Sequence, residues 1–178
     1  MKIGTYAPIW RVPCLLNGKL EHLPLTAFQG NLVVCCLSSL AETDAWLLDT
    51  QVNRFHECGS VLAVLIQDDN LVGQNWIRPP REFRLPFLTD PLRRLGRTLR
   101  LSRSLPSFRC ETLIFNQHSR LQFRLLHNLN LQGISTVLEI VQSDFCQSSN
   151  PEIPECILKS DQLDIHRFRK ETPIASYT

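Results

Sequence analysis

Thiols are the side chains of this sequence that are best suited to covalent chemistry. Seven cysteines occur, at positions 14, 35, 36, 58, 110, 146 and 156. Their number is odd, and none of their spacings matches a CxxC redox pair or a zinc site. The five histidines are also scattered, without the spacing of metal ligands. The pattern favours reduced, structural thiols in a cytoplasmic protein, and it predicts neither a metal nor another cofactor.

A run of arginines between Arg78 and Arg109 could bind anions. The run has no lysine and only two acids, Glu82 and Asp90, although the net charge of the whole chain is +2. Its nine arginines are at positions 78, 81, 84, 93, 94, 97, 100, 103 and 109. Guanidinium groups suit phosphates, carboxylates and aromatic faces.

Two interpretations of this run stay open. It is either a solvated face with internal ion pairs or a docking surface for an anionic protein, an anionic membrane surface or nucleic acid. Few aromatic residues interrupt it, so nucleic acid is the least favoured partner. We expect a helix from Leu92 to about Leu101, with Asp90 as its cap. Arg93, Arg97 and Arg100 would share one face of that helix and form the binding residues. The acids that could neutralise them from elsewhere are Glu42, Asp44 and Asp49.

A βαβ unit is expected to position the central part of the chain. The apolar runs Leu32 to Leu37 and Val61 to Ile66 have the length of buried parallel strands. A helix is predicted between them, with Thr43 as a plausible N-cap. Chemistry in such sheets usually lies at the carboxyl ends of the strands. We therefore expect a site in the loop from Ser38 to Trp46.

Other elements are predicted from turn residues and periodicity. Asn17-Gly18 indicates a β-hairpin. Thr112 to Asn116 and Leu121 to Leu126 read as an antiparallel pair joined by a tight turn. Gln132 to Gln142 has the apolar spacing of an amphipathic helix. Together the elements predict an α/β protein with a mixed central sheet flanked by helices.

The loop after the first buried strand resembles the signature of the peroxiredoxins, the redoxins of the alkyl hydroperoxide reductase and thiol-specific antioxidant type. That signature is Pro-x-x-x-Thr-x-x-Cys, and its eight positions here are Ser39 to Trp46. Thr43 keeps the threonine, Ser39 replaces the proline and Trp46 replaces the peroxidatic cysteine. Weaker matches follow the family's order from about Gly4 to Gln142, including Ala7-Pro8, Asp68 with Trp76, and the segment from Leu85 to Pro91.

The resemblance implies a thioredoxin-like fold of the peroxiredoxin type over residues 1–142, followed by a partly ordered C-terminal extension over residues 143–178. It also implies a homodimer, because peroxiredoxins commonly associate through loops around the active-site helix or by sheet edges. A gapless match places Cys110 where the family carries its second arginine, with Arg109 one residue away.

Catalysis is expected to be lost, because an indole has no ionisable group at neutral pH and is no nucleophile. We expect Trp46 to fill the peroxide pocket with apolar bulk. The chain would then be a pseudoenzyme of an antioxidant family, acting as a non-catalytic binding, scaffold or assembly subunit. The alternative is a thiol peroxidase that uses another cysteine, such as Cys110 beside Arg109, or Cys58. Cys58 follows a predicted helix, whose dipole disfavours a thiolate there.

Overall fold

The computed structural model describes residues 2–28, 30–67, 83–90, 92–103 and 105–143. Several sequence predictions fall outside these residues. They concern Asp68, Trp76, Arg78, Arg81 and all but the first residue of the C-terminal extension.

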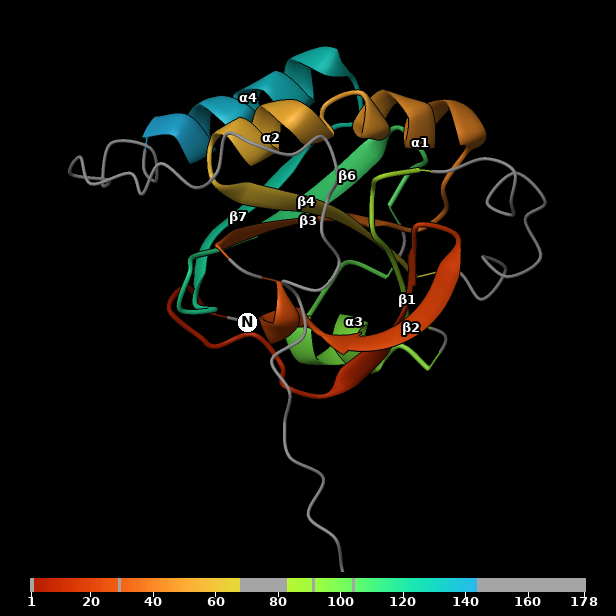
Figure 1. Ribbon diagram of the computed structural model, residues 1–178, viewed down its shortest axis with the longest axis vertical. Coiled ribbons are helices and arrows are strands. Elements are labelled where there is room, and N and C mark those ends of the chain that lie inside the picture. The colour runs from red at the N-terminus through yellow and green to blue at the C-terminus, as the bar shows by residue number, and fades with distance from the viewer. Residues whose placement is uncertain (1, 29, 68–82, 91, 104, 144–178) are drawn as a thin grey trace, which may run out of the picture.

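Seven strands of the described residues form a single mixed sheet in the order β2-β1-β5-β4-β3-β6-β7 (Figure 1). Their bounds are β1 Arg11–Leu16, β2 Lys19–Pro24, β3 Asn31–Leu37, β4 Ser60–Ile66, β5 Phe87–Thr89, β6 Arg109–Phe115 and β7 Leu121–Asn128. The predicted hairpin is confirmed, since Asn17 and Gly18 join β1 to β2 and both have positive φ. The predicted antiparallel pair is also confirmed, as β6 and β7.

Strands β3, β4 and β5 are parallel and end at the same level. Leu37 is paired in register with Ile66, and Ile66 with Thr89. The chain leaves these strands through Ser38, Gln67 and Asp90. We call this line of strand ends the carboxyl edge of the sheet. It is the place where parallel α/β sheets usually hold their sites.

Helices cover both faces of the sheet (Figure 1). The bounds are α1 Glu42–Asp49, α2 Val52–Glu57, α3 Arg94–Leu99 and α4 Leu131–Val141, with a short 3₁₀ helix at Leu25–Ala27. Helices α1, α2 and α4 pack on one face, and α3 lies on the other. The amphipathic pattern of α4 is confirmed, because Ile134, Val137, Leu138 and Val141 are all buried.

The helix between β3 and β4 differs from the prediction in its start and in its continuity. Ala41, not Thr43, is the N-cap, and its carbonyl oxygen accepts from the amides of Asp44 and Ala45. The helix also breaks into α1 and α2 at Thr50 and Gln51. The Thr50 hydroxyl donates to the carbonyl oxygen of Leu47 at 2.7 Å, which ends the first helix locally.

The arginine-bearing helix is shorter than predicted, because only six residues from Arg94 to Leu99 are helical. Arg93 and Arg100 flank it in the left-handed conformation, with φ of 51° and 53°. Arg93, rather than Asp90, is therefore the N-cap. The Asp90 carboxylate still serves the helix start, because it accepts from the amide of Gly96 at 2.7 Å.

Candidate functional site

The segment that matches the redoxin signature exposes its three signature positions, although Leu40 within it is buried. Ser39 and Thr43 are exposed, and Trp46 lies on the outer side of α1 with 43% of its surface accessible. The indole packs against the Phe83 ring, with centroids 4.6 Å apart. The core-facing positions of α1 are instead Ala45 and Leu48, which are fully buried. Trp46 thus covers Phe83 from outside rather than filling an enclosed pocket.

Arg109 and Cys110 point to opposite sides, as expected of neighbours in a strand. Arg109 is exposed at the start of β6, whereas Cys110 is fully buried. The Cys110 sulfur lies 3.4 Å from the Thr112 hydroxyl, and Cys35 approaches the same hydroxyl at 3.5 Å. A hydrogen bond with Cys35, together with burial, raises the pKa of the Cys110 thiol. Cys110 is therefore a protonated thiol without solvent access, and this is the opposite of what a nucleophile needs.

His127 completes this buried group and fixes the direction of its hydrogen bonds. Its Nδ1 lies 2.8 Å from the carbonyl oxygen of Asn128, which can only accept, so Nδ1 carries the proton. Burial lowers the pKa of the imidazole, so the neutral ring is favoured. Its Nε2 then accepts from the Thr112 hydroxyl at 2.8 Å, which leaves the hydroxyl oxygen free to accept from a neighbouring thiol. The group is internally satisfied and holds β3, β6 and β7 together.

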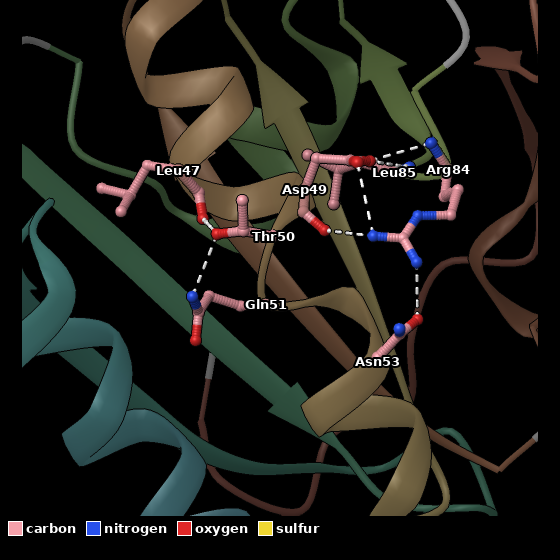
Figure 2. Close-up of polar contacts among 7 residues, drawn as sticks. All are labelled: Leu47, Asp49, Thr50, Gln51, Asn53, Arg84 and Leu85. Carbon is pink, nitrogen blue, oxygen red and sulfur yellow. Dashed lines mark hydrogen bonds and ion pairs between the residues drawn. The ribbon is translucent and has the colours of Figure 1, made fainter.

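Asp49 belongs to a second polar group, which ties the break between α1 and α2 to the chain before β5 (Figure 2). One carboxylate oxygen of this buried residue accepts from the amides of Arg84 and Leu85, at 2.8 and 3.0 Å. The Arg84 guanidinium donates to the Asp49 carbonyl oxygen and to Asn53. The other Asp49 carboxylate oxygen is 3.6 Å from Arg84. Asp49 therefore neutralises Arg84 and is not paired with Arg93, Arg97 or Arg100.

Those three arginines meet at a pocket on the α3 side of the carboxyl edge. The pocket has a volume of about 740 Å³ and is lined by Leu92, Arg93, Gly96, Arg97, Arg100, Leu101 and Arg103. We call it the arginine pocket. Its three predicted members converge by a different route from the one expected: Arg97 is helical, and the left-handed residues Arg93 and Arg100 turn the chain at the two helix ends. Arg103 joins them from the following loop.

Buried polar residues of the carboxyl edge hold the backbone of this pocket. The Gln67 side chain is buried, with 8% of its surface exposed. Its side-chain oxygen accepts a hydrogen bond from Arg93 at 2.8 Å, and its side-chain nitrogen donates to the Ser102 carbonyl oxygen at 3.4 Å. Asp90 binds the Gly96 amide, as described above. The Ser38 hydroxyl donates to the Leu105 carbonyl oxygen at 2.8 Å. Each parallel strand thus ends in a polar side chain that ties down part of the 92–105 segment.

Glu111 and Arg124 fix the far end of the segment. Glu111 is 3% exposed, forms an ion pair with Arg124 and accepts from the Ser102 amide at 2.9 Å. Arg124 also donates to the carbonyl oxygen of Arg100 at 2.7 Å. The negative charge of Glu111 is therefore neutralised by Arg124, and it does not offset the pocket arginines.

Sequence reasoning missed Gln67 and Glu111, and it placed Arg103 in the arginine run but not among the binding residues. Gln67 had a usable signal, because it directly follows a buried parallel strand. Glu111 is an acid within an otherwise apolar strand, which also marks a buried polar partner. The described residues contain no group of histidine, cysteine and acidic side chains arranged to hold a metal. Within those same residues, no helix is long and apolar enough to cross a bilayer.

Comparisons with known proteins support the fold. No protein-family profile matches the sequence, and no curated protein sequence matches it. Solved structures do match. The reduced 2-Cys peroxiredoxin of Plasmodium vivax aligns with a TM-score of 0.61 at 14% identity, covering 80% of this chain and 96% of that one. AhpC of Mycobacterium tuberculosis aligns with a TM-score of 0.61 at 16% identity, covering 81% and 94%. Peroxiredoxin Q of Xanthomonas campestris aligns with a TM-score of 0.62 at 14% identity, covering 80% and 98%.

Proposed function

The chain has the thioredoxin-like fold of the peroxiredoxins, and from that premise we propose that it is a non-catalytic binding or assembly subunit built on this fold. One observation carries the proposal. Trp46 stands on the first helix after β3 at the position where the resemblance calls for the peroxidatic cysteine, and it presents an indole to solvent. An indole neither forms a thiolate nor attacks a peroxide.

The alternative nucleophiles gain little support from their surroundings. Cys110 is fully buried and protonated within the Thr112 and His127 group. Cys58 is the C-cap of α2, the helix end where the dipole disfavours a negative charge. The four buried cysteines, Cys14, Cys35, Cys36 and Cys110, are free thiols, which fits the reducing cytoplasm that we propose for this chain.

Peroxide consumption tests the proposal directly. With thioredoxin or dithiothreitol as donor, turnover should stay at the background of a reaction without protein. The variant Trp46→Cys should also stay near background, because Ser39 replaces the signature proline, Thr43 is exposed and Arg109 points away from the Cys110 side of β6. Turnover comparable to that of an ordinary peroxiredoxin would contradict the proposal. If turnover occurs, its loss in Cys110→Ser or Cys58→Ser would identify the nucleophile.

The partner that we propose for this subunit is anionic, and it would dock on Arg93, Arg97 and Arg100. The support is electrostatic: among the described residues, Asp49, Asp90 and Glu111 each bind other groups, so none of them pairs with these guanidinium groups. We also propose that the chain forms a homodimer, as the resemblance to peroxiredoxins suggests. The resemblance places such an interface near the segments Ser38 to Trp46 and Leu88 to Leu101. Trp46 and Leu92, which are 43% and 63% exposed, offer apolar surface there.

A further inference from the structure

The arginine pocket has the size of a small-molecule site. Its volume of about 740 Å³ falls within the range of about 300–1,000 Å³ that is typical of ligand pockets. Leu92 and the buried Leu101 contribute apolar wall, and Gly96 contributes bare backbone. It also lies at the carboxyl edge of the parallel strands, where ligands usually bind in this class of sheet.

The charge of the pocket is concentrated and has one sign. Four arginines are among its lining residues, and no acid is among those that the structure describes. Of the nearby acids, Glu111 is neutralised by its ion pair with Arg124. Asp90 accepts from the neutral Gly96 amide and keeps its negative charge close to Arg93, so it offsets only part of the positive charge. Four like charges around one cavity repel one another, so a multivalent anion would relieve that repulsion when it binds.

Two of the arginines are oriented by neutral partners. Gln67 accepts from Arg93, and the Leu92 carbonyl oxygen accepts from Arg97 at 2.9 Å. Each of these bonds uses one of the five N–H donors of a guanidinium and leaves its positive charge uncompensated. Orientation before binding lowers the entropy lost when a ligand is bound. Gln67 is therefore a positioning residue for Arg93.

We propose that the arginine pocket binds a small molecule that carries two or more phosphate groups. This inference rests on the proposed function, because it names the chemistry of the anionic partner. Guanidinium forks match phosphate oxygens in pairs, and each phosphate concentrates up to about two negative charges in a small volume. A diphosphate thus supplies about three to four negative charges, close to the four positive charges that line the cavity. Carboxylates spread the same charge over a larger ligand.

Isothermal titration calorimetry of the full chain tests the proposal with four named probes: tripolyphosphate, pyrophosphate, orthophosphate and citrate. Affinity should fall in the order tripolyphosphate, pyrophosphate, orthophosphate, and citrate should bind more weakly than pyrophosphate. Binding of tripolyphosphate should weaken as salt rises, since charges at an open pocket are screened. Equal affinity for citrate and tripolyphosphate would overturn the phosphate assignment.

Variants locate the binding to this pocket. Arg97→Gln and Arg100→Gln should each weaken tripolyphosphate binding by at least about tenfold, the usual scale of a lost charge-assisted hydrogen bond. Arg94→Gln is the matched control: Arg94 is exposed, adjacent in sequence and outside the pocket lining, so its affinity should stay within about twofold of the parent chain. Gln67→Met should weaken binding while Arg93 remains present. Thermal melts of each variant verify the fold, and equal losses in Arg94→Gln and Arg97→Gln would overturn the assignment.

Two further arms separate this inference from the proposed function. Poly-glutamate that binds as tightly as tripolyphosphate, with the same sensitivity to Arg97→Gln, would overturn the phosphate class but keep the anionic docking. Binding only to vesicles that contain phosphatidylinositol bisphosphate would assign the phosphate to a lipid and overturn the small-molecule assignment. The peroxide assay depends on neither result, so a failure of the proposed function is seen independently.

Discussion

At the scale of single residues, burial separates those that hold the fold from those that could act. The sulfur of Cys110 is fully buried and the half-buried ring of His127 is engaged by Thr112, whereas Trp46, Arg97 and Arg100 are exposed. The thiol and the imidazole, which are the side chains most often found in catalysis, are thus engaged in contacts that stabilise the fold. The exposed indole of Trp46 and the pocket arginines are instead side chains that suit the binding of a partner.

Protonation of His127 should contribute to the pH dependence of the free energy of unfolding. Burial lowers the pKa of its imidazole in the folded chain, while the unfolded chain titrates near 6.5. The unfolded state therefore binds more protons as pH falls below about 6.5, and the free energy of unfolding should decrease there. His127→Gln should flatten this part of the profile measured by urea denaturation. Leu126→Gln, a change at the exposed neighbour, is the control and should keep the slope of the parent chain. Identical slopes in the parent and His127→Gln would count against this role.

At the scale of elements, the sheet was well predicted because its signals are local. Strands β3 and β4 follow from continuous apolar runs, the β1–β2 hairpin from Asn17-Gly18, and α4 from its apolar spacing. Strand β5 has three residues and was too short to show any periodicity.

The misjudged helices depend on distant partners. The start of α3 is held by Asp90 and the backbone after it by Arg124, across 6 and 24 residues of sequence. Neither contact leaves a periodic trace, so the left-handed turns at Arg93 and Arg100 could not be predicted. The convergence of Arg93, Arg97 and Arg100 was predicted, but its geometry came from those turns. The buried Gln67 behind them was not predicted at all.

The junction between α1 and α2 should depend on Asp49 more than on the exposed part of its network. Asp49→Ala would leave the amides of Arg84 and Leu85 without their acceptor, at about 1–3 kcal/mol each. We expect the free energy of unfolding to fall by about 2–4 kcal/mol in chemical denaturation. Asn53→Ala, which removes only an exposed bond to Arg84, should cost less than about 0.5 kcal/mol. Equal effects of the two changes would show that the carboxylate does not hold this segment.

At the scale of the whole molecule, the two surfaces of interest lie at one edge of the sheet but on opposite faces. Helix α1 lies in the layer that also contains α2 and α4, whereas α3 lies on the other face of the sheet (Figure 1). The arginine pocket is lined by residues of α3 and of its flanks. A second copy that docks on the Trp46 surface alone would leave the arginine pocket open, whereas one that also covers Leu92 would reach the rim of the pocket.

Light scattering at micromolar concentration should give a mass of twice the chain if the proposed homodimer forms. Trp46→Glu should shift the mass to that of one chain, because a charge would be placed within the apolar contact. Leu20→Glu makes the same kind of change at a residue 61% exposed on the hairpin, and it should leave the dimer intact. A monomeric mass for the parent chain, with a normal thermal melt, would contradict the dimer.

The outward position of Trp46 has a consequence for the evolution of the sequence. Helix α1 packs on the core through the buried residues Ala45 and Leu48, whereas Trp46 lies outside the core and covers Phe83. Cysteine and tryptophan codons differ only in their last base. In a lineage with this fold, one base change can therefore replace a cysteine at position 46 by tryptophan without changing the packing of the core. On this helix, the residues that stabilise the core, Ala45 and Leu48, are therefore separate from the position where the resemblance expects the catalytic cysteine.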